Sequence, residues 1–200
     1  MFVTRWRIRF EPGALVLRGY PFPRGSRPSR IPAEALSEVC VGWFPPAVRT
    51  REGEYLFVPA AQAHELADFA SRHGIPFVRR NDVWSFILEE FLDTEFSPEL
   101  QEGALRYLES NGVSRAETQA MRERVEKRML ALTTLTWEWQ HYGLYDVLSA
   151  MRPFTFITGG TFSRFYEESM RLADRGGVLP ATREEFSRCF SSQESDGKAS

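Results

Sequence analysis

Two side chains suited to acid–base or metal chemistry, those of Glu138 and His141, lie three residues apart in the stretch Thr136–Met151. That stretch is apolar on nearly every face of the helix that its pattern predicts. An i, i+3 spacing brings both side chains to one helical face, as in the carboxylate bundles that bind two iron ions. A carboxylate and an imidazole in such surroundings need a metal ion, a substrate or a structural hydrogen-bond partner.

A complete di-iron site is not expected, because those bundles need a second motif of this kind and further glutamates. The chain has three histidines, and neither His64 nor His73 follows an acidic residue at this spacing. A mononuclear divalent-metal site is the narrower hypothesis. Glu89, Glu90 and Asp93 would then supply an acidic strip from a facing helix.

The alternative interpretation of His141 is structural. It shares a helical stripe with Trp137, Leu144 and Leu148, and a buried histidine there would bond to Glu138 or to a nearby tyrosine. The sequence therefore predicts no cofactor, with a divalent metal as the alternative.

Arginines alternate with bulky apolar residues near the start of the chain. Arg5, Arg7 and Arg9 occupy every second position of Thr4–Phe10, so in a strand they project from one face about 7 Å apart. Through residue 30 the chain has seven arginines against Glu11 alone. The pattern predicts a surface for nucleic acid, for an acidic protein or for this chain's own acidic half, or else a solvated strand face that prevents aggregation.

The segment Trp43-Phe44-Pro45-Pro46 places two large aromatic side chains in a loop-prone context. Exposed aromatic residues are typical of partner surfaces. Trp43 and Phe44 are therefore candidate partner-binding residues. The alternative is that this tip folds back onto the helical half.

Composition and motifs disfavour several classes of protein. The 200 residues are 42% hydrophobic and 26% charged with a formal net charge of −2, unlike a dedicated nucleic-acid or membrane-surface protein. Neither a membrane span nor a secretion signal is expected. Cys40 and Cys189 are isolated in the sequence, which suits a reducing cytoplasm. Fingerprints of serine hydrolases and nucleotide-binding loops are missing from the sequence.

Residues 1–78 are predicted to form one small antiparallel sheet with a single helix against it. The sheet is expected to have four or five strands, and the strand candidates are Thr4–Phe10, Ala14–Arg18, Glu38–Trp43, Ala47–Thr50 and Glu54–Val58. The expected helix is Ala60–His73, and Ile75–Val78 is expected to be extended.

From Asn81 onward nearly every pattern is helical. Helices are expected after a cap at Asn81 or Asp82, from Ser97-Pro98, from the capping boxes Ser114–Glu117 and Thr182–Glu185, and near Phe162. An unbroken helix over Arg115–Met151 would be roughly 55 Å long, too long for a globule of this size. A break is therefore expected around Thr133–Thr136 or at Gly143.

The predicted fold is α+β, with an N-terminal antiparallel β-sheet module (1–78) packed on a C-terminal helical bundle (79–190). Residues 191–200 are expected to be a disordered tail. Residues 1–80 carry a net charge of +5 and residues 81–200 a net charge of −7. These charges favour an interface between the two parts.

The sequence favours a non-enzymatic interaction or regulatory protein of a bacterial cytoplasm, with a protein partner of unknown identity. A metal-dependent or carboxylate/histidine enzyme centred on Glu138 and His141 is the first alternative. The second is a polyanion or nucleic-acid binder that uses Arg5, Arg7 and Arg9.

Overall fold

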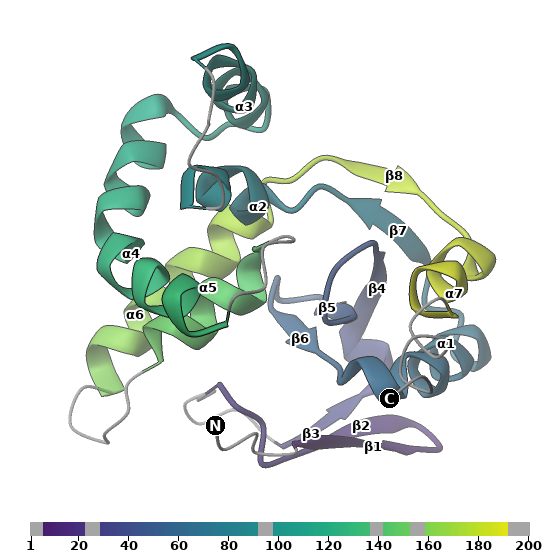
Figure 1. The fold of residues 1–200 in the computed structure, drawn as a ribbon. Helices are drawn as coiled ribbons and strands as arrows, with labels where there is room; N and C mark the ends of the chain where they lie inside the picture. Colours follow the sequence, from purple (N-terminus) through teal and green to yellow (C-terminus); the bar gives the residue numbers. More distant parts are fainter. Residues whose placement is uncertain (1–5, 23–28, 92–97, 137–141, 153–158, 192–200) are drawn as a thin grey trace, which may run out of the picture. The chain divides into compact units, whose positions relative to one another are not determined.

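The computed structural model describes residues 6–22, 29–91, 98–136, 142–152 and 159–191 of the chain. Its fold is α+β, as predicted, with two β-sheets and the helices α1 to α7 (Figure 1). The chain divides into two compact units. Unit 1 comprises Met1–Arg80 and Val178–Ser200, and unit 2 comprises Asn81–Gly177. Unit 2 is therefore an insertion in the sequence of unit 1. The division into domains at residues 1–78 and 79–190 stays a prediction.

The first sheet of unit 1 has three antiparallel strands in chain order, β1 (Arg7–Glu11), β2 (Ala14–Arg18) and β3 (Arg30–Pro32). β1 follows the period of two predicted for Thr4–Phe10, and β2 is the second arm of the predicted hairpin. Ile8, Leu15 and Leu17 are buried, whereas Arg7 and Arg9 are exposed. β3 was not predicted, because three residues between a proline-rich loop and a proline carry no strand pattern.

The second sheet has five strands in the order β6-β5-β4-β7-β8. These strands are β4 (Leu36–Val41), β5 (Ala47–Thr50), β6 (Tyr55–Phe57), β7 (Phe77–Arg80) and β8 (Val178–Pro180). β7 pairs parallel to β4, because the crossover through α1 (Ala63–Arg72) returns the chain in the same direction. The expectation of one purely antiparallel sheet was therefore wrong, and the strands form two sheets with one parallel pair.

The last strand and helix of unit 1 follow unit 2 in the sequence. β8 pairs antiparallel with β7, and α7 (Arg183–Ser191) packs against α1 and β4. The capping box of α7 forms as predicted, since Thr182 N–H donates to Glu185 Oε2 at 2.8 Å and Glu185 N–H donates to Thr182 Oγ1 at 3.2 Å. The sequence pattern assigned these residues to the helical part because a three-residue strand ending in proline resembles a loop.

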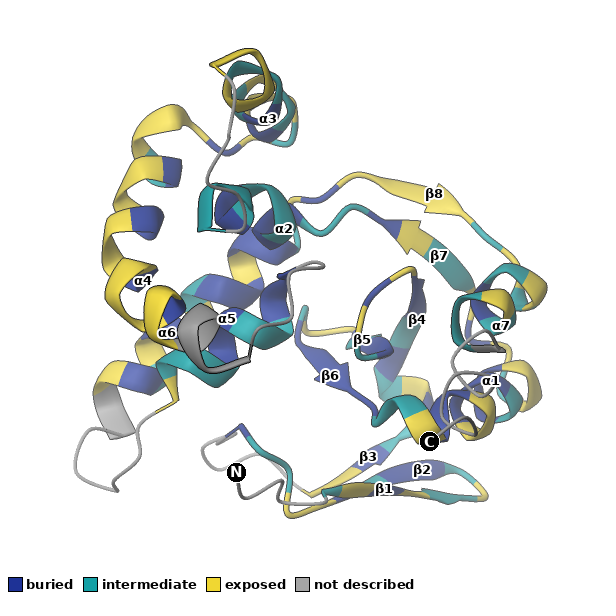
Figure 2. Cartoon of the chain, viewed as in Figure 1, coloured by how far each residue is buried: buried dark blue, intermediate teal, exposed yellow. Residues whose placement is uncertain are grey.

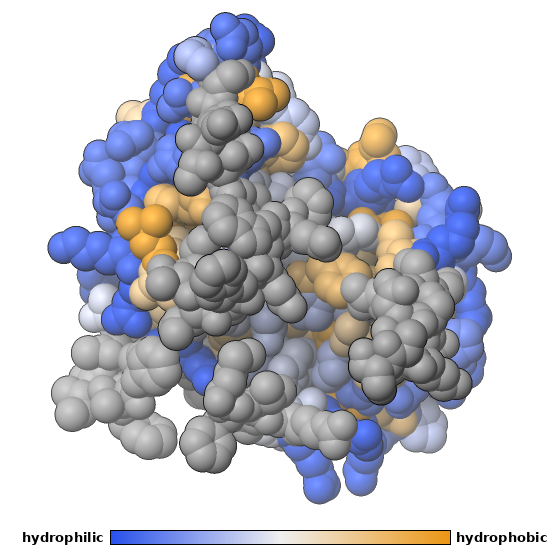
Figure 3. Space-filling model, in the orientation of Figure 1, coloured by the Kyte–Doolittle hydropathy of each residue, from blue (hydrophilic) through white to orange (hydrophobic). Residues whose placement is uncertain are grey.

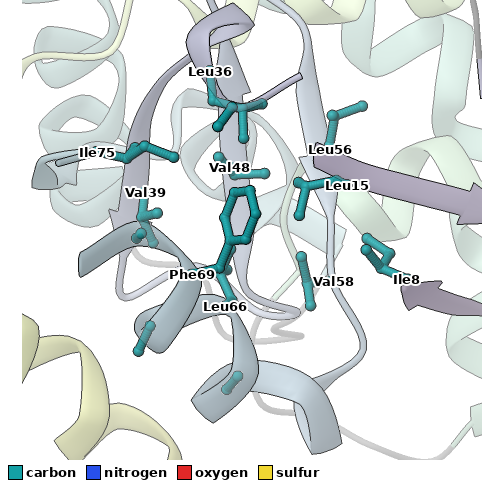
Figure 4. Packing of buried hydrophobic residues seen from close by; sticks show 14 of the residues in the cluster. Ile8, Leu15, Leu36, Val39, Val48, Leu56, Val58, Leu66, Phe69 and Ile75 are labelled. Carbon is teal, nitrogen blue, oxygen red and sulfur yellow. The ribbon is translucent and has the colours of Figure 1, made fainter. Parts of the chain in front are cut away.

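The hydrophobic core of unit 1 joins both sheets to α1 and α7. Phe69 of α1 is fully buried and lies among side chains of the two sheets, such as Leu15 of β2 and Val48 of β5 (Figure 4). Phe186 of α7 belongs to the same cluster. Burying one such side chain contributes about 1.5–3 kcal/mol, so this cluster holds the strands in place.

The described residues of unit 2 are helical apart from turns and loops. Its helices are α2 (Val83–Leu88), α3 (Pro98–Ser110), α4 (Arg115–Thr136), α5 (Leu144–Met151) and α6 (Gly159–Ala173). α2 contacts each of the other four. Its buried Trp84 donates Nε1–H to Ser169 O at 3.1 Å. Asp82 caps α2 as predicted, because its side chain accepts the Trp84 N–H.

The long helical pattern Arg115–Met151 is broken, as predicted. α4 opens with the expected capping box, in which Ser114 N–H donates to Glu117 Oε2 at 3.1 Å. α5 begins only after Gly143, which has an extended backbone. A single helix over Thr136–Met151 is therefore wrong, and residues 137–141 lie outside the described residues.

α4 buries one side and exposes the other. Met121, Val125 and Met129 are buried, while the opposite side of the helix is exposed in Figure 2 and its surface is mainly hydrophilic in Figure 3. Within the described ranges, no helix is both long and apolar enough to cross a membrane.

Unit 2 begins and ends at one place, beyond the last pair of the β7–β8 ladder. Asn81 N–H donates to Gly177 O at 2.9 Å, and Gly177 N–H donates to Asn111 Oδ1 at 2.8 Å. A side chain at Gly176 would collide with the backbone oxygen of Asn81. The place where the chain enters and leaves unit 2 therefore requires glycine at position 176.

We predict that unit 1 folds without unit 2. Replacing residues 82–176 by Asn-Gly joins Asn81 to Gly177, a hydrogen-bonded pair, through the two-residue turn that antiparallel hairpins favour. The shortened protein should unfold cooperatively in urea and keep a near-ultraviolet signal from buried Trp43. A non-cooperative transition would contradict the prediction. The control carries Pro-Pro instead of Asn-Gly and should be less stable, because proline cannot adopt the positive φ that this turn needs.

Candidate functional site

Four arginines lie on the outward face of the first sheet, and we call them the arginine face. Arg7 and Arg9 come from β1, Arg18 from β2 and Arg30 from β3, and all four are exposed. The register places Arg7 directly opposite Arg18, and it places Arg9 and Arg30 on either side of Val16. Three neighbouring strands therefore present guanidinium groups in one direction.

The inward face of the same strands positions the arginine face. Ile8, Leu17 and Ile31 are buried in the core of unit 1, and the Phe10 ring lies 5.7 Å from that of Phe69. Side chains alternate between the two faces of a strand. Burial of one set therefore turns the arginines toward solvent.

Charge on the arginine face is only partly neutralised. Glu11 pairs with Arg9 and with Arg30, whose Nε lies 3.1 Å from Glu11 Oε2. Hydrogen bonds from these two guanidiniums lower the pKa of Glu11. Arg7 and Arg18 form no ion pair with any residue that the structure describes. Like charges directly opposite one another destabilise a sheet, so packing within the fold gives no reason for this pair.

Side chains protect one edge of each sheet. On β1, Ile8 N–H donates to Gln62 Oε1 at 3.0 Å and the Gln62 amide donates to Ile8 O at 2.8 Å. On β6, Phe57 N–H donates to the Tyr20 hydroxyl at 2.9 Å. Both backbone groups of Ile8 and the Phe57 N–H are therefore occupied and cannot pair with another strand.

Prolines protect the other two edges. β3 ends in Pro32 and β8 ends in Pro180. In the ladder with β7, Ala181 N–H donates to Phe77 O. Because hydrogen-bonded and non-bonded pairs alternate in an antiparallel ladder, the backbone nitrogen of Pro180 faces away from β7. By the same alternation, the backbone nitrogen of Pro32 faces away from β2. Because proline has no N–H to offer there, each of these edges lacks one of the donors that a further strand would need.

Trp43 and Phe44, the predicted partner residues, have different surroundings. Trp43 is only 4% exposed, donates Nε1–H to Arg80 O at 2.8 Å and lies 4.7 Å from the Tyr55 ring. Its role is therefore structural, and it is not available to a partner. Phe44 is 48% exposed and stacks on Phe190 of α7 at 5.1 Å. The tip packs within unit 1, and Phe44 stays a candidate.

The predicted acidic strip is described only in part. Glu89 and Glu90 lie in a short 3-10 turn after α2. Glu90 pairs with Arg122 of α4 at 2.9 Å, and burial raises the pKa of Glu90. Arg122 is buried and also donates to Ile87 O at 3.0 Å. Glu90 therefore helps to fasten α4 to the end of α2.

The remaining candidates cannot be placed, because Arg5, Asp93, Glu138 and His141 lie outside the described residues. Within the described residues, no group of three or more histidine, cysteine or acidic side chains is arranged to hold a metal ion. The metal site therefore stays a prediction.

Two carboxyl groups that the sequence pattern did not connect meet in unit 2. Asp82 accepts the Leu144 N–H at 3.2 Å, and Asp146 accepts the Gly143 N–H at 2.9 Å. Burial raises the pKa of each to about 6. An acidic residue three positions after Gly143 was a signal for Asp146, because such a side chain can accept the N–H of the residue that precedes a helix. Its closeness to Asp82 depends on how α2 and α5 pack.

No protein-family model, curated protein or solved structure matches this chain.

Replacing Arg18 by Thr removes the like-charge contact with Arg7 and introduces a good strand former. We predict that the protein gains about 0.2–1 kcal/mol of stability at low salt. The gain should shrink at high salt, where the repulsion is screened. Urea unfolding of Arg18→Thr, Arg7→Thr and the double variant measures the coupling, and purely additive effects would rule out a repulsive pair.

Replacing Arg122 by Met leaves the buried Ile87 carbonyl and the Glu90 carboxylate without their partner. We predict a loss of about 1–3 kcal/mol in the free energy of unfolding, measured in urea. Lys127→Met, at an exposed position of the same helix, is the matched control and should change stability little. Equal effects of the two substitutions would contradict the role assigned to Arg122.

Proposed function

We propose that this chain is a non-enzymatic interaction protein whose arginine face binds an acidic segment of a partner protein. The directly opposed pair of Arg7 and Arg18 is the observation that carries the proposal. The pair weakens the sheet, and an acidic side chain from a partner would turn that repulsion into two charge-assisted hydrogen bonds.

The spacing of the face suits an extended acidic segment. Arg7 and Arg9 lie on one strand two residues apart, which separates their side chains by about 7 Å. Carboxylates at every second position of an extended peptide have the same separation. Guanidinium groups bind carboxylates through paired, parallel hydrogen bonds, so successive acidic side chains can each meet an arginine.

A nucleic-acid partner is less well supported. Surfaces for single-stranded nucleic acid stack bases on aromatic rings. The other positions on this side of the sheet are Glu11, Val16, Pro32 and the buried Ala14, none of which is aromatic. Glu11 would also repel phosphates. The net charge of −2 further weakens long-range attraction to a polyanion.

A reducing compartment suits the proposed protein. Cys40 is buried, Cys189 is half-buried, and neither forms a disulfide bond. We therefore place the interaction in the cytoplasm. The enzyme alternative depends on Glu138 and His141, which lie outside the described residues, and no observation on the described residues favours it.

The test is the binding of a fluorescent polyglutamate peptide, followed by anisotropy at low and at moderate salt. We predict salt-sensitive binding, because exposed ion pairs are screened. The double variant Arg7→Ser/Arg18→Ser should bind at least tenfold more weakly, which corresponds to about 1.4 kcal/mol. The variant Arg72→Ser/Arg188→Ser removes the same charge from α1 and α7 and should bind within about twofold of the unchanged protein.

Three outcomes would overturn the proposal. The first is that polyglutamate does not bind at low salt, and the second is that both double variants bind equally well. The third is that a single-stranded oligonucleotide binds more tightly than the peptide with the same dependence on Arg7 and Arg18, which would favour the nucleic-acid alternative.

A further inference from the structure

Two carboxyl groups meet at the first turn of α5. Asp82 accepts the Trp84 N–H of its own helix through Oδ1 at 3.0 Å and the Leu144 N–H of α5 through Oδ2 at 3.2 Å. Asp146, inside that first turn, accepts the Gly143 N–H through Oδ2 at 2.9 Å. The two side chains therefore bond to neighbouring backbone amides, and Asp82 ties α5 to α2.

The site leaves little space around these groups. Asp82 and Asp146 are both half-buried, and a side chain added at Gly143 would collide with the Asp82 carboxyl. The extended backbone of Gly143 is open to any residue. Glycine at this position is therefore explained by the close approach of Asp82 and not by backbone conformation.

We propose that Asp82 and Asp146 form a pH-sensitive clasp, which holds the first turn of α5 on α2 at acidic pH and weakens as the pH rises to neutrality. The proposal concerns unit 2 alone and is independent of the arginine face.

The electrostatic reason is that two carboxylates in a confined space cannot both ionise without cost. Burial is the main cause that raises the pKa of Asp82 to about 6, and the nearby charge of Asp146 raises it further. Burial likewise raises the pKa of Asp146 to about 6. Hydrogen bonds from backbone N–H groups lower both pKa values, but by less than burial raises them. In the closed clasp the protonated pair is therefore favoured over two negative charges.

The direction of the pH effect follows from linkage. An aspartate that is released to water returns to a pKa of about 3.9, so the closed clasp binds protons more tightly than the open one. Its stabilising effect is fully present below about pH 4 and is lost as the pH rises through about 6. Between pH 5 and pH 8 the opening equilibrium should rise about tenfold for each carboxyl group.

Other described groups around α2 do not account for such a change. Burial raises the pKa of Tyr107 of α3 above its usual value, so its hydroxyl stays neutral in this range. Arg122 of α4 stays charged and pairs with Glu90 at the opposite end of α2. α6 meets α2 through an uncharged bond to Ser169 O. Glu90 also has a raised pKa, so the experiment must separate it from Asp146.

Hydrogen exchange of the full-length protein tests the clasp. After correction for the intrinsic rate, peptides covering residues 144–151 should exchange about tenfold or more faster at pH 8 than at pH 5, whereas peptides from β4 in unit 1 should not change. Asp146→Asn keeps an acceptor for the Gly143 N–H but removes one of the two titrating carboxyl groups, so it should reduce the change about tenfold. Glu90→Gln and the exposed Glu167→Gln should leave the change in place.

Equal corrected exchange of residues 144–151 at both pH values would overturn the proposal. So would a pH dependence that is undiminished in Asp146→Asn or that disappears in Glu90→Gln. If Asp146→Asn fails to fold, carbon-13 titration of the aspartate carboxyls in the unchanged protein decides the question. Values for Asp82 and Asp146 that are both near 4 would then reject the clasp.

Discussion

The chain leaves unit 1 after β7 and returns to it through β8, and unit 1 is complete only after this return. The segments that leave and return must therefore lie side by side at the end of the β7–β8 ladder, where Asn81 N–H donates to Gly177 O. Gly176 leaves room for the Asn81 backbone, and the Asn111 side chain holds the Gly177 N–H. With this crossing in place, α7 can reach α1 and complete the core of unit 1.

Each unit also holds like charges together against their repulsion. In unit 1 the opposed arginines Arg7 and Arg18 are carried by strands whose inward side chains are buried. In unit 2 the carboxyl groups of Asp82 and Asp146 meet because α2 and α5 are in contact, and both helices bury apolar side chains. In both places apolar burial supplies the free energy that fixes the charged groups. Such places are where function is most often found, since packing alone does not explain them.

Local chemistry could be predicted from the sequence, and long-range pairing could not. The capping boxes at Ser114 and Thr182, the cap at Asp82 and the alternating burial of β1 are local patterns, and all of them are present in the structure. By contrast, the parallel pairing of β7 with β4 and the pairing of β8 with β7 join segments far apart in the chain. Three-residue strands such as β3 and β8 carry too little pattern to be recognised.

The candidate sites divide in the same way. Alternation along one strand predicted that Arg7 and Arg9 share a face, but Arg18 joins them only through the register of a hairpin. Asp146 is visible in the sequence as a capping residue, whereas its approach to Asp82 spans 64 positions of the chain. The sequence left open whether Trp43 is exposed or packs back onto the fold, because the residues that enclose it, Tyr55 and Arg80, come from other strands.

The insertion of unit 2 also sets an order in time. When a ribosome has completed β7, its antiparallel neighbour β8 is still about 100 residues away, which at ordinary rates of synthesis is about 5–20 s. All of unit 2 is made within that interval, so its helices can fold while the second sheet still lacks an edge strand. The newly made protein therefore passes through a stage in which unit 2 is fully synthesised while unit 1, which begins earlier in the chain, still lacks β8 and α7.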